Sequence, residues 1–338
     1  SGRDRLQPPV PDRIAEYRLP DTGYRLPGTN CCGAYMTENV SFDDVRRLPP
    51  RAAASHKGTF GRVLVVGGSQ TMPGAVALAT NAALRGGAGL ATFAAPRDVQ
   101  PAIASMCMCA TSLPLDCDPD GALSPACIRQ VMQQARKSDV VACGPGMGVG
   151  GDRHGVIRAL LEYDHPLVLD ADGLTNLAAL GDWPSTRRCP LVVTPHPGEF
   201  ARLSGRSIAD VQADRENVCL AAMREWGDPQ TEDVAPLVCV LKGHHTVVTD
   251  GRRLYVNQTG NPGMATGGSG DVLTGLIAAF VAQELDPFHA ACLGVWCHGR
   301  AGDLAAKELG EVSMMASDLL DYLPFAIREV SGPPETPF

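Results

Sequence analysis

Apolar runs that alternate with helical stretches are the feature that most restricts how this chain can fold. Six runs are apolar almost throughout and have the length of strands, at residues 62–68, 89–95, 139–144, 166–172, 190–195 and 236–243. Most of them are separated by stretches with helical patterning, at residues 74–85, 125–136, 152–163 and 207–226. Strands that lack alternating polar residues are buried on both faces. The pattern therefore predicts an α/β fold, with a central, mostly parallel sheet that has helices on both faces.

The pattern changes after Lys242. Asp250-Gly251 lies between two short apolar runs, which indicates a β-hairpin. Three further helical stretches follow, at residues 270–283, 286–307 and 316–328. We expect a single domain, because no internal repeat or low-complexity tract interrupts the chain. Its expected bounds are residues 55–328, with a partly irregular N-terminal extension at 1–54 and a C-terminal tail at 329–338.

Composition narrows the class of protein. A net charge of −8 gives no general attraction to nucleic acid or to an anionic membrane, and no apolar stretch reaches the length of a membrane span. The 12 cysteines are scattered and form no CxxC motif, so free thiols are favoured over disulfides or metal ligands. The first thirty residues hold no apolar run of a secretory signal. These features predict a soluble, cytoplasmic protein that binds neither nucleic acid nor membranes.

The stretch "ATGGSGDVLTGLIAAF" at residues 265–280 joins a bare helix entrance to one acid. A helix N-terminus without side chains offers unpaired N–H groups and the positive end of the helix dipole, which together bind anions. Asp271 in the first turn could orient a hydroxyl and take its proton while the N–H groups stabilise a moving phosphoryl group. The alternative is that Asp271 only caps the helix. No P-loop lysine follows the glycines, so a Walker-type ATPase is not indicated.

Four other loops follow predicted strands, and ligands of open α/β sheets bind at the carboxyl ends of strands. The loops at residues 67–75 and 144–151 are rich in glycine, which suits either a ligand or a tight turn. In residues 194–200, prolines on both sides hold His196, which either contacts a ligand or is satisfied within the turn. Lys242 ends an apolar run, where it either binds phosphate or is merely exposed.

The second of these loops formally matches a dinucleotide fingerprint. Gly146, Gly148 and Gly151 have the spacing GxGxxG, and Asp170 lies about twenty residues further on, where it could contact a ribose. This spacing is the strongest argument for a nicotinamide-dependent dehydrogenase. Pro145 inside the turn argues against it, and the hypothesis leaves the glycine-rich entrance before Asp271 without a role.

Taken together and in order, the motifs resemble a known family. They are "KGTFGRVLVVGGS", "RGGAGLAT", "GPGMG", "LDADGL", "TPHPGEFARL", "LKGHHTVV", "GNPGMATGGSGDVLTG" and "HGRAGD". Over roughly residues 55–325 the chain is similar to the ADP/ATP-dependent NAD(P)H-hydrate dehydratases, which have a ribokinase-like fold. By resemblance, it would return the S form of hydrated NADH or NADPH (NADHX or NADPHX) to NAD(P)H. The ring hydroxyl would be phosphorylated and phosphate then eliminated.

The resemblance also implies which residues form the site. Asp271 would be the acid–base group at the hydrated ring. The anion hole would consist of Gly267, Gly268, Ser269 and Gly270. The hydrated cofactor would be lined by Ala75, Gly148, His196 and Asp271. The nucleotide ADP or ATP would be held by Lys242, Gly243, His244, His245, Thr246 and Gly270. Mg²⁺ would be held largely by phosphate oxygens and water, with no certain protein ligand and Glu199 as a candidate near it.

One rival function uses the same anion hole and acid. A ribokinase-like small-molecule kinase would phosphorylate a hydroxymethyl or sugar hydroxyl and stop there. The "TPHPGE" motif and the loop at 144–148 favour the dehydratase, because they provide a second pocket of nucleotide size. The family is often fused to an epimerase domain, for which residues 1–54 are too short, so we expect a separate epimerase or a longer chain. A homo-oligomer is also expected.

Overall fold

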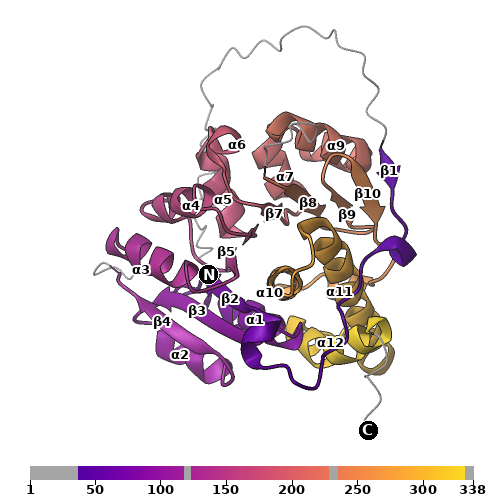
Figure 1. Ribbon diagram of the computed structural model, residues 1–338. Coiled ribbons are helices and arrows are strands. Elements are labelled where there is room, and N and C mark those ends of the chain that lie inside the picture. Colours follow the sequence, from indigo (N-terminus) through magenta and orange to yellow (C-terminus); the bar gives the residue numbers. More distant parts are fainter. Residues whose placement is uncertain (1–36, 118–122, 228–234, 332–338) are drawn as a thin grey trace, which may run out of the picture. The chain divides into compact units, whose positions relative to one another are not determined.

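The computed structural model describes residues 37–117, 123–227 and 235–331 (Figure 1). Within these ranges, ten strands form one sheet in the order β1-β10-β9-β8-β7-β6-β5-β2-β3-β4. The strands are β1 (Glu38–Asn39), β2 (Arg62–Val66), β3 (Leu90–Pro96), β4 (Thr111–Leu115), β5 (Val140–Cys143), β6 (Leu167–Leu169), β7 (Leu191–Val193), β8 (Leu237–Leu241), β9 (Val247–Thr249) and β10 (Arg253–Val256). Neighbours from β4 to β8 are parallel, whereas β9 is antiparallel to β8 and β10. The predicted mostly parallel sheet and its hairpin are confirmed.

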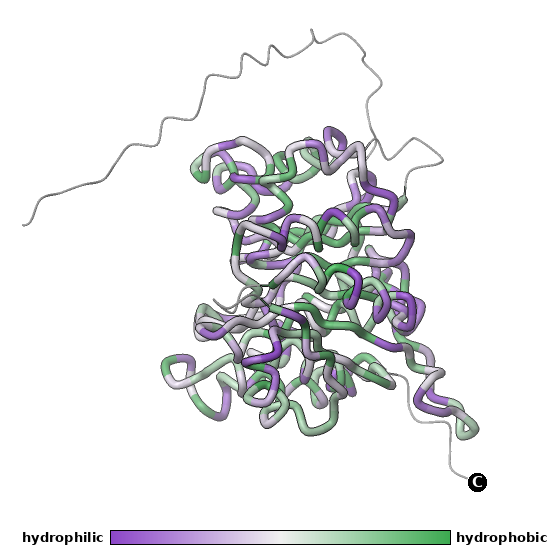
Figure 2. The backbone as a smooth tube through the Cα atoms, turned by 90° about the vertical axis from the view of Figure 1, so that its left-hand side faces the viewer, coloured by the Kyte–Doolittle hydropathy of each residue, from purple (hydrophilic) through white to green (hydrophobic). Residues whose placement is uncertain are grey.

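Helices cover both faces of this sheet. They are α1 (Pro73–Arg85), α2 (Gln100–Met106), α3 (Ala126–Ala135), α4 (Arg153–Leu161), α5 (Asp172–Ala179), α6 (Trp183–Thr186), α7 (Pro197–Ser204), α8 (Ile208–Ala213), α9 (Arg215–Trp226), α10 (Ser269–Ala282), α11 (Pro287–Leu309) and α12 (Ala316–Val330). Val63 and Val65 of β2 pack in one core with α1 and α10–α12, whereas Leu64 and Val66 pack in a second core with α3–α9. Because both of its faces are buried, the centre of the sheet is built from strands that are almost entirely hydrophobic (Figure 2).

The single helix predicted over residues 207–226 is wrong, because the chain forms two helices there. Ser207 caps α8 by accepting a hydrogen bond from the N–H of Asp210, and Asp214 caps α9 by accepting one from the N–H of Asn217. Asp214 lies outside the helical region, at φ −150° and ψ 73°. Its short acidic side chain competes with the helical hydrogen bonds and restarts the helix. Arg215 is therefore the first residue of α9, from which its side chain reaches the loop after β8.

Several elements were not predicted. The edge strand β4 carries Thr111 and Ser112 and is largely half-exposed, so it lacks the apolar run of the central strands. Helices α2, α5, α6 and α7 have four to eight residues each, which is too short for a clear helical period. Two of them, α5 and α7, follow strands β6 and β7 and carry residues of the site.

The last part of the predicted N-terminal extension packs on the domain. Strand β1 pairs in parallel with β10, and Val45 is buried. The ring of Phe42 stacks on Trp296 of α11 at 4.4 Å between centroids, and the guanidinium of Arg47 lies 3.8 Å from the Phe42 centroid on the ring face. Residues 1–36 of the extension and 332–338 of the tail lie outside the described ranges.

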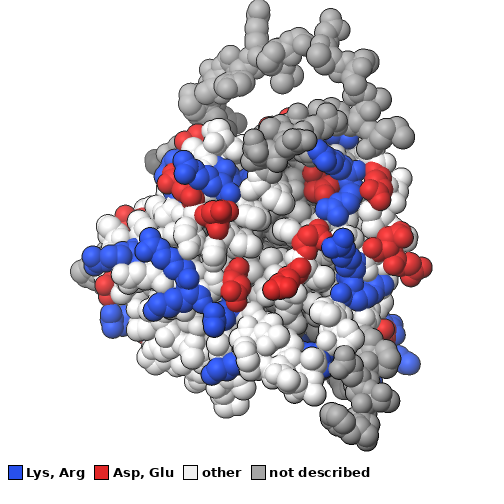
Figure 3. Space-filling view, in the orientation of Figure 1, with Lys and Arg blue, Asp and Glu red and all other residues white. Residues whose placement is uncertain are grey.

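No helix in the described ranges is both long enough and apolar enough to cross a bilayer. On the face drawn in Figure 3, acidic side chains border the hollow at its centre, while most basic ones lie farther out. The ten cysteines of the described ranges are free, as predicted, and Cys31 and Cys32 lie outside these ranges.

Phe42→Ala should measure how much the segment before residue 55 stabilises the domain. The substitution removes the stack on Trp296 and the ring under Arg47, so the free energy of unfolding should fall by about 1–2 kcal/mol. Thermal melting followed by circular dichroism would measure the change. Phe325→Ala, which removes a 47% exposed ring from α12, is the matched control and should have a smaller effect. Equal melting temperatures for the two variants would contradict a stabilising role for the segment.

Candidate active site

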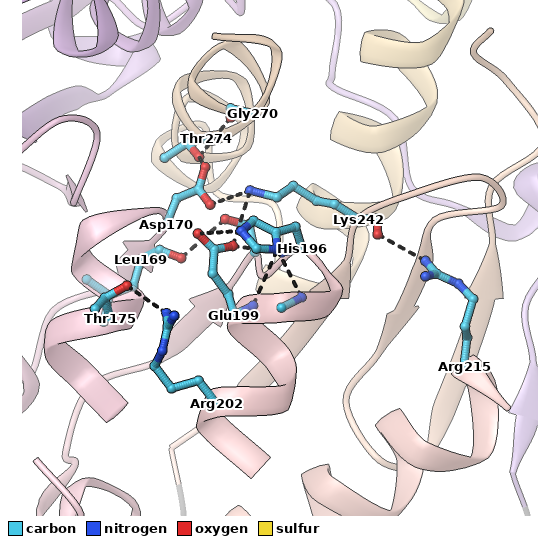
Figure 4. A network of polar contacts seen from close by, with 12 residues as sticks. Leu169, Asp170, Thr175, His196, Glu199, Arg202, Arg215, Lys242, Gly270 and Thr274 are labelled. Atoms are coloured by element: carbon cyan, nitrogen blue, oxygen red, sulfur yellow. Dashed lines mark hydrogen bonds and ion pairs between the residues drawn. The ribbon is translucent and has the colours of Figure 1, made fainter. Parts of the chain in front are cut away.

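Four elements meet at the carboxyl ends of the central strands (Figure 4). Asp170 directly follows β6, and Lys242 directly follows β8. The ammonium Nζ of Lys242 donates to Oδ1 of Asp170 at 2.5 Å and lies 3.9 Å from Oε2 of Glu199 on α7. The hydroxyl of Thr274 on α10 donates to the other oxygen of Asp170 at 2.7 Å. A buried ion pair therefore ties two strand ends to the helix that carries Asp271.

The ion pair is held in its charged form. Burial raises the pKa of Asp170, but the charge of Lys242 and the hydrogen bonds from Lys242 and Thr274 outweigh burial and bring the pKa below its usual value. Burial lowers the pKa of Lys242, and the charges of Asp170 and Glu199 outweigh it and raise this pKa. Asp170 is 1% exposed, so its charge depends on these partners and on the backbone N–H of Ala171.

The pKa of Asp271 is shifted in the opposite direction from that of Asp170. Burial, followed by the charge of Asp170, raises the pKa of Asp271 to about 7 against the opposing charge of Lys242. A carboxylate whose main role was to cap the helix would be stabilised as an anion and would have a lowered pKa. The raised pKa instead poises Asp271 to take up or release a proton near neutral pH, as a general acid or base must.

The entrance of α10 is open where the sequence has glycines. Gly268 has a φ of +97°, and a side chain there would collide with Leu78, so glycine is required. A side chain at Gly267 would meet no atom within 4 Å. At Gly270 an added Cβ would lie 3.1 Å from Nζ of Lys242, so the ammonium rests against the first turn of the helix. The helix N-terminus offers backbone N–H groups beside the Lys242 ammonium, which are donors that suit a phosphate.

The loop after β5 lies next to Ala75 and is held by α5. A Cβ at Gly146 would lie 3.1 Å from Cβ of Ala75 in the first turn of α1. The N–H of Gly148 donates to Asp172 at 2.9 Å, and the N–H of Gly150 donates to Asn176 at 2.8 Å. A dinucleotide-binding turn would present these N–H groups to a pyrophosphate. Because side chains of α5 accept their hydrogen bonds, the fingerprint spacing does not form the site of a dehydrogenase.

His196 and Glu199 begin α7. The Nδ1 of His196 accepts from the N–H of Gly198 at 3.0 Å, and Glu199 accepts from the N–H of His196 at 2.8 Å. The His196 ring caps the helix, yet its side chain is 58% exposed and can also contact a ligand. Burial and the charge of Lys242 lower its pKa, so the ring is neutral at pH 7. Burial raises the pKa of Glu199 to about 7, with the charge of Lys242 opposing it.

The predicted nucleotide loop follows β8. His244 and His245 are exposed side by side, with ring centroids 3.8 Å apart, and Thr246 donates to the carbonyl of Gly243 at 3.0 Å. Arg215 supports this loop from α9, because its Nη2 donates to the carbonyls of Leu241 and Lys242 at 2.9 and 3.1 Å.

The sequence analysis did not identify four supporting residues, which are Arg215, Asp172, Asn176 and Thr274. Asp172 lies inside the "LDADGL" motif and Thr274 inside "GNPGMATGGSGDVLTG", which could have indicated them. None of the quoted motifs contains Arg215 or Asn176.

Residues 63–325 match a protein-family model described as NAD(P)H-hydrate dehydratase. The chain belongs to the NAD(P)H-hydrate dehydratase family. The resemblance seen in the motifs is thereby confirmed. A bifunctional NAD(P)H-hydrate repair enzyme of Moorella thermoacetica is 44% identical over 293 residues, which are 86% of this chain and 53% of that protein. An ADP-dependent (S)-NAD(P)H-hydrate dehydratase of Neisseria meningitidis is 39% identical over 267 residues, covering 77% and 82% of the two chains. The chain spans about half the length of its bifunctional relatives.

Two solved structures have the same fold as this chain. The Bacillus subtilis ADP/ATP-dependent NAD(P)H-hydrate dehydratase, co-crystallised with ATP and Mg²⁺, has a TM-score of 0.71 and 30% identity, covering 87% of this chain and 99% of that one. A ribokinase-like superfamily protein of Enterococcus faecalis has a TM-score of 0.70 at 24% identity, covering 90% and 100% of the two chains. The predicted ribokinase-like fold is confirmed.

Asp271→Asn should stabilise the folded protein at alkaline pH. The pKa of Asp271 is about 7 in the folded state against a usual value of 3.8, so the folded state binds more protons between these values. Its stability therefore falls as pH rises through this window, and removing the charge should add roughly 1–3 kcal/mol at pH 8. Urea unfolding at pH 8 and pH 4 would measure this gain and its loss at low pH. Asp321→Asn, at an exposed carboxylate, should show no such gain. Equal stability of Asp271→Asn and the wild type at pH 8 would contradict the buried charge.

Proposed function

We propose that this protein is a nucleotide-dependent dehydratase that returns the S form of hydrated NADH or NADPH to NAD(P)H. The observation that carries the proposal is Asp271, which has a pKa of about 7 at an open, glycine-rich helix entrance beside Lys242. The name of the Neisseria relative supports an ADP-dependent (S)-NAD(P)H-hydrate dehydratase, and the Bacillus enzyme was crystallised with ATP and Mg²⁺. Both ADP and ATP are therefore proposed as phosphate donors.

In the proposed first step, the hydroxyl of the hydrated ring is phosphorylated. The carboxylate of Asp271 accepts the hydroxyl proton while the oxygen attacks the terminal phosphorus of ADP or ATP. The bond from that phosphorus to the bridging oxygen breaks, and AMP or ADP leaves. The N–H groups of Gly267, Gly268, Ser269 and Gly270, together with the Lys242 ammonium, offset the charge on the phosphoryl oxygens.

In the proposed second step, phosphate leaves. The carbon–oxygen bond breaks and its electrons go to the phosphate, while the neighbouring ring carbon loses a proton, which the phosphate takes up. The electrons of that C–H bond form the ring double bond and restore NAD(P)H. The products are then NAD(P)H, phosphate and the shorter nucleotide.

The two substrates are proposed to meet at Asp271. Ala75, Gly148 and the exposed ring of His196 are proposed to line the hydrated cofactor, since they follow strands β2, β5 and β7. Lys242 and Gly270 are proposed to hold the nucleotide with Gly243, His244, His245 and Thr246. A homo-oligomer and a separate epimerase as partner stay predictions.

The side chains fit a Mg²⁺ held mainly by the nucleotide. In the described ranges, no group of three His, Cys, Asp or Glu residues is arranged to hold a metal ion. The carboxylate of Glu199 accepts the N–H of His196 and faces Lys242, so at most it lies near the ion. When bound, Mg²⁺ would neutralise part of the phosphate charge.

A dehydration assay tests the proposed function. Protein, hydrated NADH and Mg²⁺ are mixed with ADP or ATP, and the return of NADH absorbance is followed together with phosphate release. We expect both signals with at least one nucleotide and neither signal without nucleotide. No return of absorbance from folded protein would contradict the dehydratase. Consumption of nucleotide without return of absorbance would indicate a kinase that stops after the first step.

Asp271→Ala should remove turnover and preserve nucleotide binding. Loss of the proton acceptor should lower kcat by about 10²–10⁴-fold. Titration calorimetry with ADP and Mg²⁺ should give a dissociation constant close to that of the wild type. In the wild type, kcat/KM should rise with pH through about 7, because Asp271 must be ionised to accept the proton. A fully active variant, or a rate independent of pH between 5.5 and 8, would contradict this role.

His196→Asn should weaken binding of the hydrated cofactor alone. Asparagine is a good N-cap, so it retains the start of α7 while it removes the exposed ring. We expect the KM for hydrated NADH to rise about fivefold or more, with kcat changed much less. His244→Ala is the matched control, since it should raise the KM for the nucleotide instead. An unchanged KM for hydrated NADH in His196→Asn would exclude the ring from the cofactor site.

A further inference from the structure

Two motifs from the sequence have no role in the proposed chemistry, and in the fold they contact each other. "GNPGM" at residues 260–264 belongs to the loop that leads into the α10 entrance, and "HGRAGD" at 298–303 lies in α11. A Cβ at Gly299 would collide with Thr259, and a Cβ at Gly302 would collide with Met264. These glycines allow the loop to lie directly against α11.

The start of the loop is bound to α11 by Asp303. One carboxylate oxygen of Asp303 accepts from the N–H of Gly260 at 3.0 Å, and the other accepts from the side-chain amide of Asn261 at 3.2 Å. The oxygen of Asn261 in turn accepts from the N–H of Gly263 at 3.0 Å. The hydroxyl of Thr259 adds a bond to the carbonyl of Trp296 at 2.9 Å.

The end of the loop is bound to α11 by His298. Its Nε2 lies 2.9 Å from the carbonyl of Ser269, the first residue of α10. Because a carbonyl can only accept, Nε2 carries the proton of this bond. Burial lowers the pKa of His298 to about 4, so the ring is neutral at physiological pH and keeps this single donor. The Ser269 hydroxyl donates to the carbonyl of Met264 at 2.8 Å and closes the loop on itself.

We propose that His298 and Asp303 are positioning residues for phosphoryl transfer, because they fix both ends of the loop that forms the anion hole. This inference rests on the proposed function. Neither residue is placed against a substrate, and each acts through the backbone of residues 260–269. N–H groups stabilise a transition state only when they are held at the place where charge develops, so a small displacement of Ser269 and Gly270 lowers the rate.

A pair of substitutions at His298 tests the inference. His298→Leu removes the donor at similar size, whereas His298→Gln retains an N–H donor near the position of Nε2. We expect His298→Leu to lower kcat about 10–100-fold with the KM for hydrated NADH changed less than about twofold. His298→Gln should recover most of the lost kcat. His289→Leu removes another half-buried imidazole of α11, which binds the N–H of Arg46, and should leave kcat unchanged.

Asp303→Asn provides a second test if His298→Leu does not fold. Asparagine has the size of aspartate, but its amide N–H₂ would face a group that also donates, either the N–H of Gly260 or the amide of Asn261. One hydrogen bond to the loop is then lost, and kcat should fall about tenfold. Calorimetric binding of ADP with Mg²⁺ should also weaken about threefold or more in both variants. Wild-type kcat and wild-type ADP affinity in His298→Leu and Asp303→Asn would overturn the inference. A wild type that binds ADP but has no dehydratase activity would instead contradict the proposed function. The ADP affinities of the two variants relative to the wild type would then test the inference without the activity.

Discussion

The ion pair between Lys242 and Asp170 is the interaction on which the rest of the site depends. The two residues end strands β8 and β6, which the parallel sheet brings to the same edge on either side of β7. The hydroxyl of Thr274 on α10 also donates to Asp170, so the ion pair connects the sheet to the helix that carries Asp271. Loss of either partner would leave a buried charge uncompensated, at a cost of several kcal/mol. A change that disrupts the ion pair would therefore also destabilise the folded domain.

The same ion pair makes the acids of the site differ in pKa. Asp170 accepts a hydrogen bond from the ammonium of Lys242 and has a lowered pKa. Glu199, whose carboxylate lies 3.9 Å from that ammonium, and the half-buried Asp271 both have a pKa of about 7. Carboxyl groups that differ in this way can perform different tasks in one site. Here Asp170 is structural and permanently charged, while Asp271 can exchange a proton at neutral pH.

Glycines allow three parts of the fold to approach one another closely. Gly270 admits Lys242 to the first turn of α10, and Gly299 and Gly302 admit the preceding loop to the surface of α11. Helix α10 itself lies between α1 and α11, with its N-terminus bare and its apolar face in the core (Figure 1). The proposed anion hole is thus held from two sides, by α11 and by the ion pair.

The sequence by itself determined the fold class and the place of Asp271, the proposed catalytic acid, because both are encoded locally. Apolar runs predict buried parallel strands, and glycines before Asp271 predict an open helix entrance. Only the tertiary structure decided that Asp170, which resembles the ribose-binding acid of a dinucleotide fold, pairs with Lys242 across a separation of 72 residues. It also decided that Arg215 supports the nucleotide loop, since the break at Asp214 interrupts an apparently continuous helix. Such partners, and the pKa values they set, arise from the order of strands in the sheet, which no local pattern encodes.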